Sequence, residues 1–241
     1  MIRTSLILIL FFTLLLQTTV NAQKRPTVIE LFTSQGCSSC PPADQLLEQI
    51  KKEFGNDVIT LSYHVDYWDY IGWKDPFATR RFTQKQYTYA EKFRSRSVYT
   101  PQAVINGRTH HTGSDKAAIY RVLNAENKIT NPIDLTITKT QKEGKTIAVT
   151  YALSEINTAN ELTFVIAIDE KITAVKRGEN RNKTLKNTHI VVAEQTISTQ
   201  TTNGQLLLQL PDWIQNSDQL SVIAYATKAN VGIIDAVTKR L

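Results

Sequence analysis

The stretch from Thr27 to Ile50 constrains the fold of this chain most, and it reads TVIELFTSQGCSSCPPADQLLEQI. It contains the only two cysteines of the 241 residues, Cys37 and Cys40. The nearly continuous apolar run before them is typical of a strand covered on both faces. Pro41-Pro42 fits only the first turn of a helix, where the missing N–H has no partner. The sequence therefore predicts a buried strand, a loop with the Cys-x-x-C pair and an amphipathic helix that begins at the cysteines.

This placement favours redox chemistry at the pair. The thiolate is the nucleophile in disulfide exchange, and unpaired N–H groups at a helix start stabilise an anion. We expect Cys37, the more N-terminal and more exposed residue, to be the attacking sulfur. Cys40, inside the first turn, would resolve the mixed disulfide. The sequence thus predicts a thiol–disulfide oxidoreductase whose partners are exported proteins or small thiols.

Two other interpretations of the pair remain open. An inert disulfide in a non-catalytic binding protein is one, although closing so small a loop contributes only roughly 2 kcal/mol. A copper(I) carrier is the other, because copper(I) binds thiolates and imidazoles and His110-His111 could supply one of the latter. Adjacent strand residues point to opposite faces, so at most one of these histidines could turn toward the pair. We expect no resident metal and no cofactor.

The first 22 residues have the plan of a cleavable secretory signal. Arg3 precedes an apolar core from Leu6 to Leu16, and small residues end the segment at Ala22. The core is too short to span a membrane, and no later stretch approaches that length. We expect an exported protein of an oxidising compartment, most simply a bacterial periplasm. The formal net charge of +6 is dispersed, which favours solubility over nucleic-acid binding.

The mature chain is long enough for two domains, and its patterning changes near Asn131-Pro132. Before that point apolar strands alternate with helical segments, including one that opens at Asp75-Pro76 and another capped by Ser114. After it come seven short alternating strands and a basic loop over Lys176 to Thr188. We predict an α/β domain over residues 23–129 and an antiparallel β-sandwich over residues 130–241, with a substantial shared interface.

The order strand, Cys-x-x-C helix, strand, helix, X-Pro strand, strand, helix resembles the thioredoxin fold. In this resemblance Cys37 and Cys40 match the redox pair, and Thr100-Pro101 matches the cis-proline turn that faces it. More closely, the chain is similar to an uncharacterised family of bacterial secreted proteins with a thioredoxin-like domain and a β-rich C-terminal domain. The similar motifs are ELFTSQGCSSCPPAD, HVDYWDYIGWKDPFA, YTPQAVING and RGEN. The predicted fold class is thus an α/β thioredoxin-like domain followed by an all-β sandwich.

The resemblance implies no established activity, and one dipeptide departs from thioredoxins. Ser38-Ser39 stands where they have Gly-Pro, so their redox potential does not carry over.

Several accessory residues have both a chemical and a structural interpretation. His64 and Asp66 share a face if their strand stays regular, and they would form either a proton relay for the thiols or a hydrogen-bonded structural pair. Glu30 lies in the buried strand and would either accept a proton from the resolving thiol or form a structural salt bridge, which we favour. An aromatic loop that includes Trp68 and Trp73 would either form the floor of a peptide-binding groove or, as we prefer, cover the core or the domain interface.

Overall fold

A computed structural model describes residues 25–126, 134–154 and 159–241 of the chain. The predicted signal segment, residues 1–22, and the predicted boundary between residues 129 and 130 lie outside these ranges. Within them, no helix is long and apolar enough to cross a membrane.

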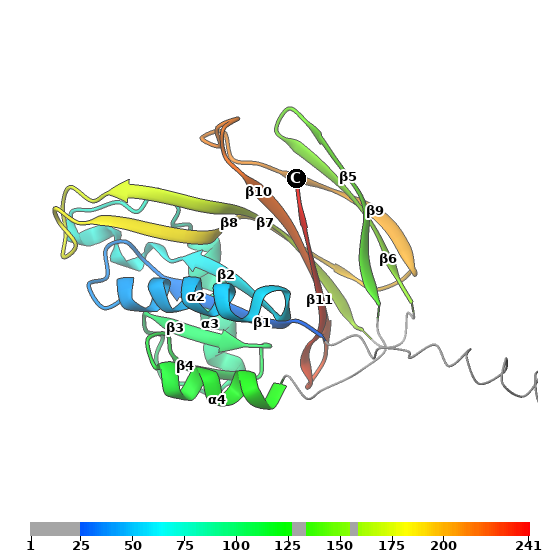
Figure 1. The fold of residues 1–241 in the computed structure, drawn as a ribbon, viewed down its shortest axis with the longest axis horizontal. Helices are drawn as coiled ribbons and strands as arrows, with labels where there is room; N and C mark the ends of the chain where they lie inside the picture. Colours follow the sequence, from blue (N-terminus) through cyan, green and yellow to red (C-terminus); the bar gives the residue numbers. More distant parts are fainter. Residues whose placement is uncertain (1–24, 127–133, 155–158) are drawn as a thin grey trace, which may run out of the picture.

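The first half of the chain alternates strands and helices around the Cys-x-x-C loop (Figure 1). Thr79 caps the second long helix by accepting a hydrogen bond from the Phe82 amide, so this helix begins after the predicted start at Asp75-Pro76. The elements are β1 (Thr27–Thr33), α2 (Pro41–Phe54), the 3₁₀ helix η1 (Gly55–Asp57), β2 (Val58–His64), the 3₁₀ helix η2 (Asp66–Ile71), α3 (Arg80–Lys92), β3 (Gln102–Ile105), β4 (Thr109–Thr112) and α4 (Lys116–Glu126).

The second half consists of strands, as its alternating pattern predicts. Two of them are longer than expected and form a protruding arm, so that the predicted basic loop shortens to residues 175–183. The strands are β5 (Leu135–Glu143), β6 (Thr146–Leu153), β7 (Glu161–Ala174), β8 (Thr184–Ser198), β9 (Asn203–Gln209), β10 (Leu220–Lys228) and β11 (Gly232–Arg240).

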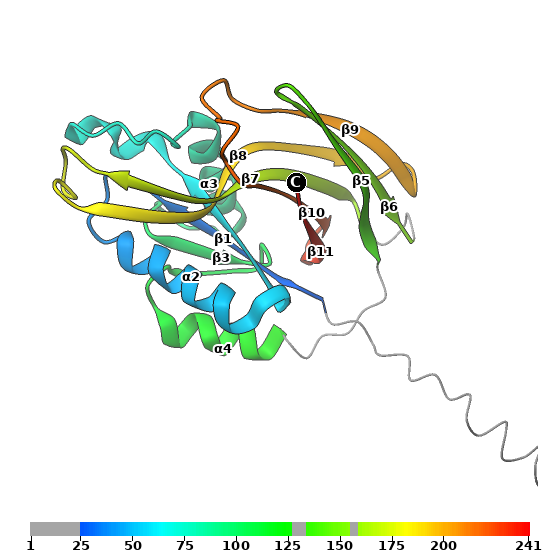
Figure 2. The same cartoon turned by 45° about the horizontal axis from the view of Figure 1, so that its top comes forward.

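The strands form two sheets that do not follow the predicted division (Figures 1 and 2). One mixed sheet of eight strands has the order β11-β10-β7-β8-β2-β1-β3-β4, and a second sheet has the order β5-β6-β9. The prediction of an α/β thioredoxin-like domain followed by a separate antiparallel β-sandwich is therefore wrong. Four strands from the second half extend the sheet of the first half instead of building their own sandwich.

The two halves meet where β8 runs parallel to β2. Ser62 pairs with Ile190 there, and the Ser62 hydroxyl donates to the Thr188 carbonyl at 2.8 Å. A periodic apolar pattern shows that a strand is buried but not which strand it pairs with. This explains why sequence reasoning found the strands and misassigned the sheet.

Three apolar clusters cover the large sheet. The helices α2 and α4 pack on one face of β1 and β3, while α3 packs on the opposite face and reaches β7 and β10. The sheet of β5, β6 and β9 packs on β7 and β10 through the alternate residues of those strands (Figure 2). The Cys-x-x-C loop follows the carboxyl end of β1 and leads into α2, close to the tip of the β7–β8 arm.

A buried polar cluster also ties the halves together. Lys85 of α3 lies 3.0 Å from the Glu30 carboxylate of β1 and 2.6 Å from that of Glu194 in β8. Tyr89 donates a hydrogen bond to Glu30. Burial alone would lower the pKa of Lys85, but the charges of Glu194 and Glu30 raise it well above its usual value. The favoured prediction of a structural salt bridge at Glu30 is confirmed.

Candidate functional site

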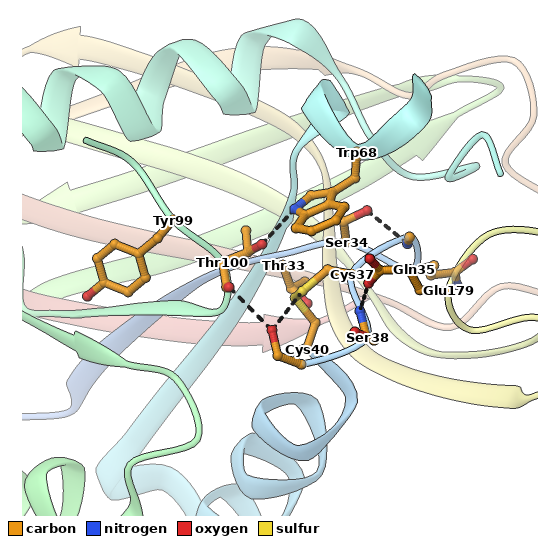
Figure 3. The surroundings of a disulfide bond; sticks show 12 residues. Thr33, Ser34, Gln35, Cys37, Ser38, Cys40, Trp68, Tyr99, Thr100 and Glu179 are labelled. Atoms are coloured by element: carbon orange, nitrogen blue, oxygen red, sulfur yellow. Dashed lines mark hydrogen bonds between the residues drawn. A yellow bond between two sulfur atoms is a disulfide. The ribbon is translucent and has the colours of Figure 1, made fainter. Parts of the chain in front are cut away.

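The Cys-x-x-C loop joins β1 to α2, and its cysteines form a disulfide with a Cα–Cα distance of 5.4 Å (Figure 3). Cys40 directly precedes α2, whose first turn holds Pro41 and Pro42 as predicted. Both cysteines have no exposed surface, while Ser38 and Ser39 between them are exposed. The expectation that Cys37 is the more exposed sulfur is therefore wrong, because other segments of the chain cover it.

The Thr100–Pro101 peptide is cis, as predicted, and it lies beside the disulfide loop. Ser39 Oγ is 3.5 Å from the Thr100 carbonyl oxygen, and the Trp68 indole N–H donates to Thr100 Oγ1 at 2.7 Å (Figure 3). The turn before β3 thus faces the loop that carries the cysteines.

The two tryptophans of the aromatic segment border this loop. Trp68 belongs to η2 and packs on the core beneath α3, while the Trp73 indole N–H lies 3.3 Å from Gln35 Oε1. Tyr70, in contrast, is 82% exposed. Trp68 thus covers the core, in line with the preferred interpretation, whereas for Trp73 that interpretation stays a prediction.

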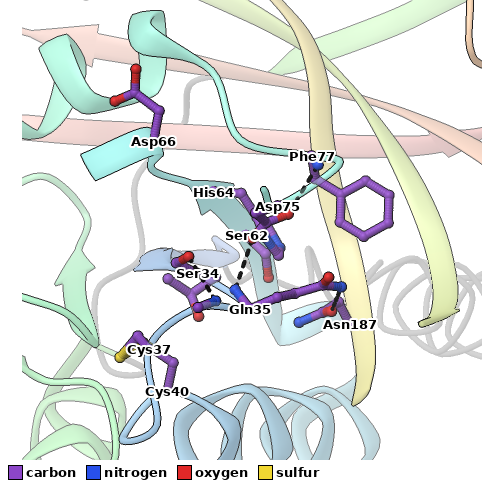
Figure 4. Close-up of polar contacts among 12 residues, drawn as sticks. Ser34, Gln35, Cys37, Cys40, Ser62, His64, Asp66, Asp75, Phe77 and Asn187 are labelled. Atoms are coloured by element: carbon purple, nitrogen blue, oxygen red, sulfur yellow. Dashed lines mark hydrogen bonds and ion pairs between the residues drawn. A yellow bond between two sulfur atoms is a disulfide. The ribbon is translucent and has the colours of Figure 1, made fainter. Parts of the chain in front are cut away.

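His64 has a different partner from the one predicted. Its Nδ1 lies 2.7 Å from Asp75 Oδ2, whereas Asp66 accepts a hydrogen bond from Thr83 and points away (Figure 4). The predicted His64–Asp66 pair is wrong because β2 ends at His64 and the chain then turns into η2, so the strand alternation does not continue.

The His64–Asp75 pair is fully buried. Burial lowers the pKa of His64, but attraction to Asp75 and their hydrogen bond raise it above its usual value. Burial likewise raises the pKa of Asp75, and the charge of His64 outweighs that effect and lowers it. Asp75 also accepts the Gln35 amide at 2.8 Å, which anchors the loop before Cys37.

Asp44 is a second buried acid, one helical turn after Cys40. Its amide donates to the Cys40 carbonyl at 3.1 Å, and residues four apart on a helix lie on the same face. Oδ2 accepts the Thr33 hydroxyl at 3.3 Å, while Oδ1 has no hydrogen-bond partner. Burial raises the pKa of Asp44 to about 7. A carboxyl group in this state can exchange a proton near neutral pH.

Sequence reasoning missed a set of residues that hold the loop from a distance. Asn180, 143 residues after Cys37, donates from Nδ2 to the Cys37 and Gln35 carbonyls, each at 2.9 Å. Gln35 Nε2 donates to Asn187 Oδ1 at 2.9 Å (Figure 4). The RGEN motif, residues 177–180, was the sequence signal that could have pointed to these residues. Nothing in its composition, however, predicts that it lies beside the cysteines.

The histidines of the copper interpretation lie on β4, the edge strand. His110 Nδ1 is 2.9 Å from Tyr99 Oη, and its ring packs against Phe93. Among the described residues, no group of three or more His, Cys, Asp and Glu side chains is arranged to hold a metal ion. The structure thus lends the copper interpretation no support.

Fold and site together define a mostly β protein with a large mixed sheet and a buried disulfide at the start of a helix. The chain belongs to the family described as protein of unknown function DUF1223, whose model matches residues 28–227. The resemblance to an uncharacterised family is confirmed, whereas these comparisons do not support a thioredoxin-like domain.

One solved structure is similar over nearly the whole chain. The crystal structure of protein AGR_C_4864 from Agrobacterium tumefaciens has 30% sequence identity and a TM-score of 0.63, covering 90% of this chain and 95% of its own. A β-glucosidase from Kluyveromyces marxianus in complex with glucose has 10% identity and a TM-score of 0.26, covering 77% of this chain and 18% of its own, which carries no inference. No curated protein matches the chain.

Proposed function

We propose that this chain is an exported thiol–disulfide oxidoreductase that acts through Cys37 and Cys40. The observation that carries the proposal is the position of the disulfide. It closes a ring of only four residues at the start of α2, beside the cis Thr100–Pro101 turn. A ring of this size contributes only roughly 2 kcal/mol to folding, so stabilisation of the fold is a weak reason for the presence of the disulfide. Export is supported by the signal-like pattern of residues 1–22.

The exchange proceeds in two steps. The Cys37 thiolate attacks one sulfur of a substrate disulfide, which forms a mixed disulfide and releases one substrate thiolate. Cys40 then loses its proton to Asp44 and attacks the Cys37 sulfur. This step restores the Cys37–Cys40 disulfide and releases the second substrate thiolate. The same steps in reverse oxidise a substrate dithiol.

Asp44 suits the role of proton acceptor because of its place on α2. It shares a helix face with Cys40, one of its oxygens has no partner, and its pKa of about 7 lets it take and return a proton near neutral pH. Glu30, the acid that sequence reasoning weighed for this role, is already paired with Lys85.

Trapping of the mixed disulfide tests the proposal. Cys40→Ser keeps the attacking sulfur and removes the resolving one, so mixed disulfides with exported proteins or small thiols should accumulate. Cys37→Ser is the matched control and should accumulate far fewer. The readout is a non-reducing gel of the exported fraction, with bands identified by mass spectrometry.

A second candidate function is a non-catalytic binding protein with an inert disulfide. The burial of both cysteines favours it, because a sulfur without exposed surface does not meet a substrate in this conformation. If neither variant traps a partner and the native disulfide resists glutathione, the oxidoreductase proposal fails and this candidate replaces it.

A further inference from the structure

The tip of the β7–β8 arm, residues 177–180, contacts the Cys-x-x-C loop, whose two cysteines have no exposed surface. Asn180 is fully buried and donates to the Gln35 and Cys37 carbonyls. Glu179 Oε2 accepts the Ser38 amide at 2.9 Å (Figure 3). The tip therefore binds the backbone at Gln35, at Cys37 and at Ser38.

These contacts belong to a packed structure. Lys183 Nζ donates to Asn180 Oδ1 at 3.0 Å, which orients the amide toward the loop. Gly178 has a φ of +73°, and a Cβ there would lie 3.2 Å from Trp73 Cβ. Only glycine combines this backbone conformation with so close an approach at low cost. The tip is thus held between the loop and the segment that contains Trp73.

Glu179 also places a negative charge on the backbone amide of Ser38, the residue that follows Cys37. The hydrogen bonds with Ser38 lower the pKa of Glu179, so its carboxylate is ionised at neutral pH. The Ser38 amide lies just before α2, where free N–H groups would otherwise stabilise a thiolate. Glu179 occupies this donor and repels a second negative charge.

We propose that residues 177–180 form a cover that regulates the redox pair, in which Asn180 holds the loop closed and Glu179 opposes formation of the Cys37 thiolate. Displacement of the cover exposes Cys37, frees the Ser38 amide and removes the repulsion in one movement. Within the proposed exchange reaction, the attacking thiolate is therefore stabilised mainly when a partner moves the tip aside. The chemical state of Cys37 can be measured whether or not exchange is the function.

The test uses the Cys40→Ser protein, in which Cys37 is the single thiol. Its rate of alkylation by iodoacetamide is followed from pH 5 to pH 10, with and without Glu179→Gln. Two unit charges about 6 Å apart in water change an equilibrium about threefold, so Glu179→Gln should lower the Cys37 pKa by about 0.5. The matched control is Glu161→Gln, which removes an exposed acid at the far end of β7 and should leave the profile unchanged.

Varying the salt concentration distinguishes an effect of the Glu179 charge on the Cys37 pKa from an effect of a changed structure. In 1 M NaCl the Debye length is about 3 Å, so the effect of Glu179→Gln should disappear. Asn180→Ala should instead raise the alkylation rate at both salt concentrations, because it releases the loop without changing charge. An unchanged pH profile in Glu179→Gln, or a change that persists in 1 M NaCl, overturns the role of Glu179.

This outcome is independent of the trapping experiment. A shifted Cys37 pKa without mixed disulfides supports the cover and refutes exchange. Mixed disulfides with an unshifted pKa support exchange and refute the charge effect of Glu179.

Discussion

Replacing Asp44 with asparagine should stabilise the protein, and more strongly as the pH rises. Asp44 is 8% exposed, and burial raises its pKa from the usual 3.8 to about 7. The folded state therefore keeps a proton that the unfolded state releases above about pH 4. The contribution of Asp44 to stability is fully present at low pH and is lost as the pH rises toward 7.

The size of the effect follows from these two values. At pH 8, where Asp44 is ionised in both states, its raised pKa costs the folded state about 4 kcal/mol. At pH 5, where the folded state keeps a proton that the unfolded state has lost, the cost is about 2 kcal/mol, since each pKa unit corresponds to about 1.4 kcal/mol. Asparagine resembles the neutral carboxyl group in size and does not ionise. The free energy of unfolding of Asp44→Asn should exceed that of the native protein by these amounts.

Urea unfolding of the oxidised proteins at pH 5 and pH 8 measures this difference. Asp212→Asn, which changes an exposed aspartate, is the matched control and should shift stability by less than about 0.5 kcal/mol at either pH. A difference for Asp44→Asn that does not grow with pH would refute the reasoning, and so would a loss of stability at pH 8. A buried acid that weakens the native fold at neutral pH is typical of a functional group.

Two further changes test the packing around the site. Lys85→Met should lower the free energy of unfolding by roughly 3–5 kcal/mol, because it leaves Glu30 and Glu194 buried without their cation. Lys92→Met, an exposed lysine of the same helix, is the control, and a loss below 1 kcal/mol for Lys85→Met would contradict the assignment. Gly113→Ala should cost about 1–3 kcal/mol in the same assay, since its Cβ would lie 3.0 Å from both Ala43 Cβ and Pro101 Cβ. Unchanged stability there would show that β4 can shift away from α2.

Features that depend on neighbouring residues could be predicted from the sequence. The strand before Cys37 and the helix that begins at Pro41 follow from an apolar run and from the one helical position that tolerates proline. The seven strands that the structure describes in the second half were found from alternation. The cis peptide at Thr100–Pro101 came from the resemblance of the element order.

Features that depend on which segments meet were decided by the tertiary structure. The pairing of β8 with β2 joins the two halves in one sheet. Because β2 ends at His64, this histidine pairs with Asp75 and not with Asp66. Asn180 reaches the Cys37 carbonyl across 143 residues, and the Cys37 side chain, which its local position suggested was exposed, is fully buried. Local patterns report burial and chain direction, whereas the identity of a distant neighbour depends on packing that no single segment encodes.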